Sequence, residues 1–352
     1  MNLWKDCKHI LCIRPDNMGD LLMSSPAIRA IKETFNCKIS VLVSDKGAEV
    51  ARLIPSIDEV ISCNLPWLKH SDTQNSSETL SLVHTLKAKQ FDGCIVFNVY
   101  SQNPVPSIML AYLADIPLRA AYCRENLYGL LTDWLPDPEP YHDIIHQVQR
   151  DLRLAGFIGA FTQHDSIHIQ IRPQRLLQDK LKQLALEPKQ YFILHPGVSE
   201  AKREYPVNLW IELGQHMIKK YGIPIVLTGN DNDRSLLMEM QKGIGYGAFP
   251  VTDLNVEELS SLISTALVMV AVNTGPVHLT SAVQTPVVVL YAQTNPQHHP
   301  WKVKSKVLEF SVDEINQSKN EVIRFVNNQF YQEKIPYPSV EMIDAAIESL
   351  MG

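Results

Sequence analysis

The sequence lacks the excess of positive charge that nonspecific binding to nucleic acid requires. Its 352 residues include 32 lysines and arginines against 38 aspartates and glutamates, a net charge of −6 at pH 7. Proteins that hold nucleic acid mainly through its phosphates carry a basic surface instead. The composition therefore predicts that nucleic acids are not partners of this chain.

Two further absences concern cysteine spacing and hydrophobic length. The six cysteines all lie within the first 123 residues, and no two are spaced as C-x-x-C, so zinc and thioredoxin-like sites have no support. Several lie in apolar runs, where a reduced thiol packs as a small hydrophobe. No stretch reaches the roughly 18 apolar residues of a membrane span, and the N-terminus carries charges where a signal peptide is apolar. We expect free thiols and a cytoplasmic protein, which could still contact the inner face of the cytoplasmic membrane.

Several nucleotide-binding and hydrolase motifs are also missing. There is no G-x-x-x-x-G-K-[ST], and the one glycine cluster, GIGYG at 243–247, lacks the G-x-G-x-x-G spacing. G-x-S-x-G and H-E-x-x-H are absent too. No D-x-D pair follows the early strands, where a metal-dependent nucleotide-sugar transferase would carry one. We therefore expect neither a P-loop nor a nicotinamide site, and no bound metal.

What the sequence does contain is a repeated alternation of strand and helix. With 45% apolar and 20% charged residues, the chain can bury the cores of two domains. In the first half, apolar periodicity predicts strands at 9–14, 38–43, 58–61 and 93–97, and helices from residue 20 onward and at 47–53, 78–89 and 144–155. The last helix is expected to end at Gly156 in a left-handed cap, and residues 115–145 read as an irregular surface loop.

The second half repeats the alternation. Strands are predicted at 191–194, 223–227, 268–272 and 286–290, and helices at 208–221, 233–243, 256–264 and 276–283, after a strand at 167–171 and a helix at 176–186. This pattern predicts an α/β protein with two doubly wound parallel sheets, in domains 1–170 and 171–335. Residues 336–352 form an amphipathic helix that could pack back on the first domain. Ligands of such sheets bind at the carboxyl ends of the strands.

The first loop with chemical potential is PDNMGD at 15–20, between a strand and a helix. Asp20 is expected at or near the helix N-terminus, where aspartate is among the best capping residues. A carboxylate at a ligand-binding edge can also act as a general base. Both roles are open for Asp20, and Asp16 is a weaker second candidate for the base.

Three loops of the second half could hold a phosphate. In HPGVSEAKREYP (195–206), Gly197 and Ser199 leave backbone amides exposed, and Lys202 or Arg203 could reach a polyphosphate, unless the loop is simply solvated. LTGNDND (227–233) ends in helix-capping residues. In VNTGPVHLTSA (272–282), Asn273 and Thr274 are candidate caps, while Gly275 and Pro276 suit a phosphate-binding helix N-terminus. His278 alone is more often structural than catalytic.

These segments together resemble the bacterial heptosyltransferases, the ADP-heptose:lipopolysaccharide type of glycosyltransferase in family nine. The resemblance rests on MGDLLMSSPAIRAIK (18–32), HQVQRDLRLAG (146–156), the HPG and aromatic-Pro pair of 195–206, LTG (227–229) and LSSLISTALVMVAVNTGPVHLTSAVQTPVVVLYAQTNP (259–296). It implies a GT-B fold of two facing Rossmann-like domains, the first binding a glycan or lipid-linked acceptor and the second a nucleotide-diphospho-sugar. It also implies transfer with inversion, no cofactor and no required metal.

The resemblance further assigns roles to single residues. Asp20 matches the base proposed for the family. The donor site it implies comprises His195, Gly197, Ser199, Lys202, Arg203, Thr228, Gly229, Asn273, Thr274, Gly275, Pro276 and His278. A basic side chain and the amides at Thr274, Gly275 and Val277 would stabilise the leaving diphosphate.

The sequence departs from the family pattern at ligand positions. Arg203 stands where the family usually has lysine, with Lys202 one position earlier, and Tyr205 replaces tryptophan. Asn273 replaces an aspartate expected to contact hydroxyls of the donor sugar, which hints at a donor other than heptose. A sugar-nucleotide epimerase and a transfer-inactive nucleotide-sugar-binding protein remain alternatives.

Overall fold

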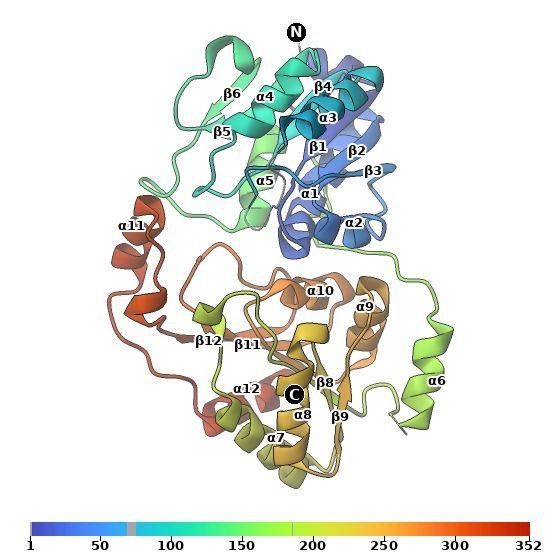
Figure 1. Ribbon diagram of the computed structural model, residues 1–352, viewed down its shortest axis with the longest axis vertical. Coiled ribbons are helices and arrows are strands. Elements are labelled where there is room, and N and C mark those ends of the chain that lie inside the picture. Colours follow the sequence, from blue (N-terminus) through green and yellow to red (C-terminus); the bar gives the residue numbers. More distant parts are fainter. Residues whose placement is uncertain (1, 69–74, 185) are drawn as a thin grey trace. The chain divides into compact units, whose positions relative to one another are not determined.

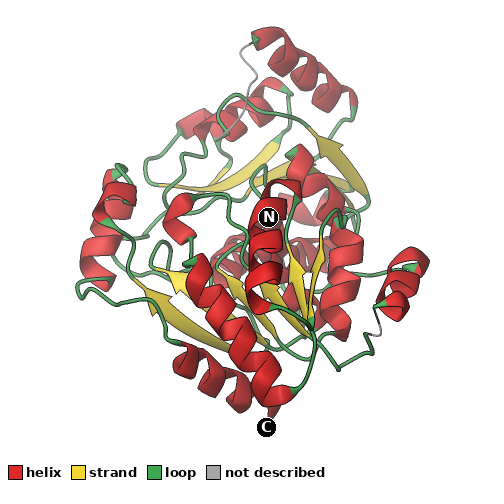
Figure 2. Cartoon of the chain, turned by 60° about the horizontal axis from the view of Figure 1, so that its bottom comes forward, coloured by secondary structure: helices red, strands yellow, loops and turns green. Residues whose placement is uncertain are grey.

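The computed structural model describes residues 2–68, 75–184 and 186–352, and the chain separates into two compact units, Met1–Gln170 and Ile171–Gly352 (Figure 1). Each unit contains one parallel six-stranded sheet. Helices cover both faces of each sheet (Figure 2). Residue 185, inside the helix predicted for 176–186, lies outside the described residues.

The sheet of the first unit has the order β3-β2-β1-β4-β5-β6. Its strands are β1 (His9–Ile13), β2 (Lys38–Val43), β3 (Glu59–Ser62), β4 (Gly93–Val96), β5 (Leu118–Cys123) and β6 (Asp133–Pro136). Its helices are η1 (Leu3–Asp6), α1 (Met18–Phe35), α2 (Asp45–Ala51), α3 (Ser76–Ala88), α4 (Val105–Leu113), η2 (Tyr128–Leu130) and α5 (Gln147–Phe157).

The central strands of this sheet are buried on both faces, which explains why they read as continuous apolar runs. Leu11 and Ile13 of β1 pack in a core with Leu86 of α3 and Ile108 of α4. Helices α1 and α5 contact each other. The loop after β1 therefore connects two packed elements, the central strand β1 and helix α1.

The sheet of the second unit has the order β12-β11-β10-β7-β8-β9. Its strands are β7 (Phe192–His195), β8 (Ile225–Thr228), β9 (Ala248–Val251), β10 (Met269–Val272), β11 (Val287–Ala292) and β12 (Ser305–Phe310). Its helices are α6 (Arg175–Gln183), η3 (Ala201–Arg203), α7 (Val207–Tyr221), η4 (Asp231–Asp233), α8 (Arg234–Ile244), α9 (Val256–Thr265), α10 (Gly275–Val283), η5 (Glu314–Asn316), α11 (Glu321–Phe330) and α12 (Val340–Met351).

Some sequence-based expectations are wrong. Residues 115–145 contain β5 and β6 rather than only an irregular loop, and no strand forms at 167–171. Helix α5 continues through Gly156 to Phe157, because the left-handed glycine that follows the helix is Gly159, with a φ of 88°. The left-handed glycine therefore lies three residues later than expected, while the helix itself ends only one residue beyond Gly156.

Helix α12 belongs to the second unit. Its buried face, Val340, Ile343, Ile347 and Leu350, packs in the core of that unit, and it contacts α7, β11 and β12. Burial of each such aliphatic side chain contributes roughly 1.5–3 kcal/mol relative to exposure. Helix α12 is therefore an integral part of the second unit.

The cysteines are free thiols, as the sequence predicted, and all but Cys63 are buried. Burial raises the pKa of the Cys12 thiol well above its ordinary value, so this thiol is protonated at neutral pH. Within the described parts of the chain, no helix combines the length and the apolar character needed to cross a membrane.

Candidate functional site

In each sheet there is one pair of neighbouring strands at which the strand order reverses: successive strands are added to one side of the sheet before this point and to the other side after it. In the first sheet this place lies between β1 and β4, and in the second between β7 and β10. Ligands of open α/β sheets bind beyond the carboxyl ends of the strands at such places. The loops after β1, β7 and β10 are therefore where candidate residues belong.

Asp20 lies in the first turn of α1 and takes part in a capping box with Asn17. Its Oδ2 accepts the Asn17 backbone N–H at 3.3 Å, while Asn17 itself is the N-cap. Its Oδ1 lies 3.3 Å from Nη2 of Arg14, and its side chain keeps 17% of its surface exposed. The capping role is thus present, and the exposed part of the carboxylate leaves room for a second role.

Asp16 is the less exposed of the two carboxylates. Its Oδ1 accepts a hydrogen bond from Nε2 of Gln102 at 2.6 Å, and its Oδ2 lies 3.3 Å from Nη1 of Arg14. Only 10% of its side chain is exposed. Asp20 is therefore the better placed of the two carboxylates to meet a ligand.

His195, the last residue of β7, is buried and pairs with the neighbouring strand. Its Nδ1 lies 2.9 Å from Oγ1 of Thr228 at the end of β8. Burial lowers the pKa of His195 to about 4, so its ring is neutral at physiological pH. His195 can offer a hydrogen bond to a ligand but no positive charge.

Gly197 and Gly229 flank the carboxylate of Asp233. A Cβ on Gly197 would lie 2.3 Å from Oδ2 of Asp233, and one on Gly229 would lie 2.7 Å from its Cβ. The same Oδ2 accepts the Asn230 backbone N–H at 2.9 Å, and burial raises the pKa of Asp233. The two glycines are thus required by packing between the loops after β7 and β8.

The two cations after β7 are not equivalent. Both pair with Glu200: Nζ of Lys202 lies 3.4 Å from its Oε2, and Nη2 of Arg203 lies 3.2 Å from the same atom. Arg203 also donates through Nη1 to the backbone carbonyl of Asn273 at 3.0 Å. Arg203 is therefore fixed beside the residues that open α10.

The side chain of Asn273 joins β10 to β11. Its Oδ1 accepts the Ala292 N–H at 3.1 Å, and its Nδ2 donates to the Ala292 carbonyl and to Oγ1 of Thr294, each at 3.1 Å. An aspartate could not donate these two bonds. These hydrogen bonds explain why an asparagine suits this position, whatever the donor sugar is.

The N-terminus of α10 offers fewer free amides than the sequence suggested. The Thr274 N–H donates to the Val272 carbonyl, and the Val277 N–H donates to the Thr274 carbonyl, because the chain turns tightly here. Of the three amides expected to bind phosphate, only that of Gly275 has no backbone acceptor among the described residues. Pro276 has no N–H to offer. Because the Thr274 and Val277 amides already donate to backbone carbonyls, they are not free to bind phosphate as the sequence suggested.

The remaining candidates divide by exposure. His278 is buried in α10, with its ring 6.4 Å from that of His298, whereas Ser199 is exposed in the loop after β7. Among the described residues, no group of three or more His, Cys, Asp or Glu side chains could hold a metal ion. The anion-binding potential therefore rests on Arg203, Lys202 and the start of α10.

Comparison with known proteins identifies the family. Residues 79–327 match the profile described as glycosyltransferase family 9 (heptosyltransferase). The chain belongs to this family. A Haemophilus influenzae protein provisionally named as a glycosyltransferase is 24% identical over 289 residues, which cover 78% of this chain and 79% of that protein. This family 9 protein is thus a glycosyltransferase.

Solved structures agree with this family 9 assignment at the level of the fold. A family 9 glycosyl transferase from Veillonella parvula gives a TM-score of 0.78 at 16% identity, covering 98% of this chain and 97% of that one. ADP-heptose lps heptosyltransferase II of E. coli gives 0.73 at 20% identity, covering 97% and 98%. The two parallel-sheet α/β domains therefore have the GT-B fold, as the sequence predicted.

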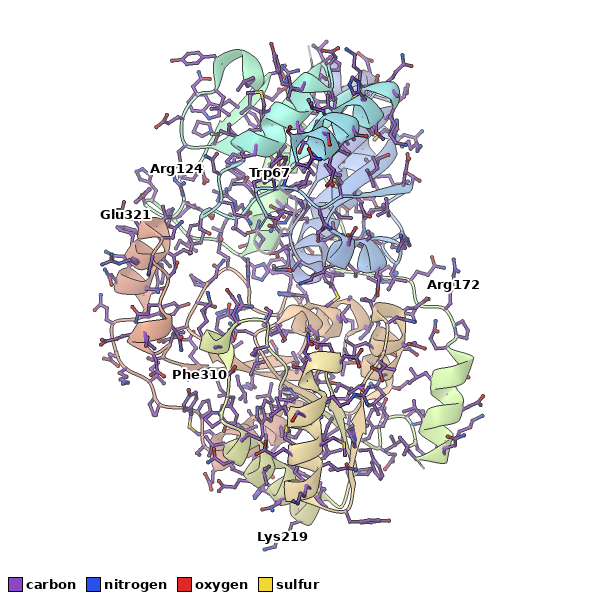
Figure 3. All side chains as sticks on the ribbon, in the orientation of Figure 1. Trp67, Arg124, Arg172, Lys219, Phe310 and Glu321 are labelled. Atoms are coloured by element: carbon purple, nitrogen blue, oxygen red, sulfur yellow. The ribbon has the colours of Figure 1, made fainter. Side chains whose placement is uncertain are left out.

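One departure from the family 9 pattern is explained by packing. Tyr205 is buried against Trp210, with ring centroids 5.3 Å apart, and near Phe310 at 6.5 Å (Phe310 is labelled in Figure 3). Its hydroxyl donates to the Pro338 carbonyl at 2.7 Å. A tryptophan ring has no hydroxyl to make this bond, so Tyr205 ties the loop after β7 to the segment before α12.

Sequence reasoning missed three residues that shape the loops. Arg14 ends the run of β1 and reads as a strand residue, Glu200 reads as an ordinary polar loop residue, and Asp233 reads only as a helix-capping residue. The acidic pattern offered a weak signal: Asp16 and Asp20 flank one loop, and buried acidic residues require a cationic partner or hydrogen-bond donors. No comparable signal marks Asp233, whose contacts join loops that are distant in sequence.

Proposed function

We propose that this glycosyltransferase transfers heptose from ADP-heptose to a hydroxyl of a glycan or lipid-linked acceptor such as the lipopolysaccharide core. The transfer inverts the anomeric centre and uses no metal or other cofactor. E. coli heptosyltransferase II, which shares the fold, is named for ADP-heptose.

One observation carries the proposal. Arg203 is held against the Asn273 carbonyl, two residues before Gly275 opens α10. A guanidinium, a free amide and the positive end of a helix dipole thus lie in one short stretch of the second unit. Together they suit the diphosphate of a nucleotide sugar, and Arg203 rather than Lys202 is the principal phosphate ligand.

In this reaction Asp20 takes up the proton, and Arg203, Gly275 and His195 contact the donor. Asp20 accepts the proton of the acceptor hydroxyl while that oxygen attacks the anomeric carbon. The bond from the anomeric carbon to the diphosphate oxygen breaks, and its electron pair leaves with the nucleoside diphosphate. Arg203 and the Gly275 amide stabilise this developing negative charge. The neutral ring of His195 can donate one hydrogen bond to the donor.

The acceptor class also implies a location. A lipid-linked acceptor is reached at a membrane surface, so we place the protein in the cytoplasm with peripheral contact to the inner face of the cytoplasmic membrane. Cell fractionation tests this placement: recovery of part of the protein with inner-membrane vesicles, released by high salt, is expected.

A ligand screen tests the donor. Binding to the folded state raises the melting temperature, so ADP-heptose should stabilise the protein more than UDP or GDP sugars at equal concentration. A larger stabilisation by a UDP or GDP sugar would replace the ADP assignment.

The variant Asp20→Asn tests the base. An asparagine Oδ1 can still accept the Asn17 N–H, so the helix cap is retained while the proton acceptor is lost. Transfer should fall by about 100- to 10,000-fold, the usual contribution of a general base, with nucleotide binding unchanged. Near-normal transfer by this variant rules out Asp20 as the base.

A further inference from the structure

The fully buried guanidinium of Arg14 lies between the carboxylate of Asp16, in the loop after β1, and that of Asp20, in the first turn of α1. Arg14 has no exposed side-chain surface; its Nη1 lies 3.3 Å from Asp16 Oδ2 and its Nη2 lies 3.3 Å from Asp20 Oδ1. It directly follows β1, and its own backbone N–H donates to the Leu42 carbonyl of β2. The cation is therefore anchored by the sheet, while the carboxylates belong to the loop and the first turn of α1.

Helix α5 supplies the other charged groups around Arg14. The carboxylate of Asp151 is buried and accepts hydrogen bonds from Ser24 Oγ at 2.6 Å and Gln147 Nε2 at 2.8 Å. Its neighbour Arg150 is paired with Asp137 and Glu139. The charges that face Arg14 are thus three carboxylates, from the loop, α1 and α5, and one further guanidinium.

These neighbours keep Arg14 charged. Burial lowers the pKa of Arg14, and Arg150 lowers it too, but the three carboxylates raise it by more, so the net shift is upward. Burial raises the pKa of the Asp151 carboxyl, in spite of its hydrogen bonds. Arg14 is therefore a permanent cation that must balance more than one carboxylate.

We propose that Arg14 is a positioning residue for Asp20. Its guanidinium holds Oδ1 of the carboxylate in place and balances the charge that Asp16 and Asp20 bring to one short loop. This inference rests on the proposed role of Asp20 as the base. Asp16 competes with Asp20 for the same cation, so Asp16 tunes the pH at which Asp20 works.

A purely structural role is the alternative for Arg14. A buried ion cluster can fix a loop without affecting the reaction, and its loss would then lower stability alone. The two roles differ in what they change: positioning of the base alters kcat and its pH dependence, whereas loss of stability alters neither in the protein that remains folded.

The decisive variants are Arg14→Gln, Arg14→Lys and Asp16→Asn in the full chain, with transfer measured from pH 4 to pH 9. In R14Q, kcat should fall by about 100-fold, as for other misplaced catalytic groups, and the acidic limb of the profile should move to higher pH because two carboxylates lose their cation. R14K keeps one charge but only a point donor, so it should recover part of kcat. The KM for donor and the Kd for ADP should not change.

D16N is the matched variant that preserves the fold. Its Oδ1 can still accept from Gln102, and Arg14 remains, so Asp20 shares the guanidinium with one carboxylate fewer. The acidic limb should move to lower pH in D16N and back toward its normal position in the double variant R14Q/D16N. D16N also decides the matter if R14Q does not fold.

Two results overturn the inference. One is an R14Q enzyme with lowered melting temperature but normal kcat and pH profile; the other is a D16N enzyme whose acidic limb does not move. Failure of the base assignment is a separate result, since it appears as transfer activity in Asp20→Asn.

Discussion

Nη1 of Arg203 donates a hydrogen bond to the backbone carbonyl of Asn273 at 3.0 Å, which ties the loop after β7 to the residue that precedes the N-cap of α10. Its Nη2 pairs with Glu200 at 3.2 Å. Two contacts of a planar guanidinium restrict its orientation more than a single contact of an ammonium. Within the described part of the chain, Lys202 pairs with Glu200 alone, so it is the less fixed cation of the two.

Arg203→Ala should weaken ADP binding more than Lys202→Ala. A hydrogen bond to a charged group contributes about 1.5–3 kcal/mol, so loss of Arg203 should raise the Kd about 10- to 100-fold. Lys202→Ala is the matched control and should raise it by less. Isothermal titration calorimetry with ADP measures both, and a larger effect of Lys202→Ala would transfer the phosphate role to that lysine.

Glu200→Gln should tighten ADP binding. The Glu200 carboxylate pairs with both cations, so a diphosphate must compete with it for them. Loss of a partly exposed ion pair of about 1 kcal/mol corresponds to a gain of about fivefold in affinity, smaller at high salt. Glu204→Gln, an exposed acid in the same loop, is the charge-matched control. Equal affinities of the two variants would mean that Glu200 does not compete with the ligand.

How well the sequence predicts a strand depends on whether its apolar run is uninterrupted. Lys38–Val43 is predicted with its observed bounds, because an interior parallel strand is apolar along its length. The strands β5, β6, β9 and β12 were missed; the last three are edge strands and are only partly buried. Their sequences, DWLP, AFPV and SKVLEF, contain proline or charged residues that interrupt an apolar run.

The candidate loops could be predicted, but not the contacts within them. A parallel sheet brings all its strand ends to one edge, so PDNMGD, HPG and NTGP follow from the order of the elements. Which atoms meet there depends on tertiary packing: Asp233 fills the space beside Gly197, and the Asn273 amide bonds to Ala292. Neither pairing leaves a periodic signal in the sequence.

His195 should make the folded protein less stable as the pH falls from about 6.5 to about 4. Burial lowers the pKa of His195 to about 4 in the folded state, whereas an unfolded histidine has its ordinary value of 6.5. In this interval the unfolded chain binds a proton that the folded chain does not, so stability falls with pH by at most about 1.4 kcal/mol per unit. Denaturant unfolding at several pH values measures this slope. His195→Asn should flatten it, whereas the exposed His164→Asn should not; an equal slope in both variants contradicts the assignment.

Asn273→Asp should destabilise the protein although it restores the residue usual in the family pattern. The carboxylate can still accept the Ala292 N–H, but it cannot donate to the Ala292 carbonyl and would place its charge against that oxygen. A buried acceptor left without its donor costs about 1–3 kcal/mol, which lowers the melting temperature by several degrees. Thr294→Val, which removes only the second acceptor of Nδ2, is the control and should cost less. If Asn273 joins β10 to β11 and does not contact the sugar, both variants should prefer the same donor sugars, in the same order, as the natural protein. A changed order in Asn273→Asp alone would mean that this residue contacts the donor sugar.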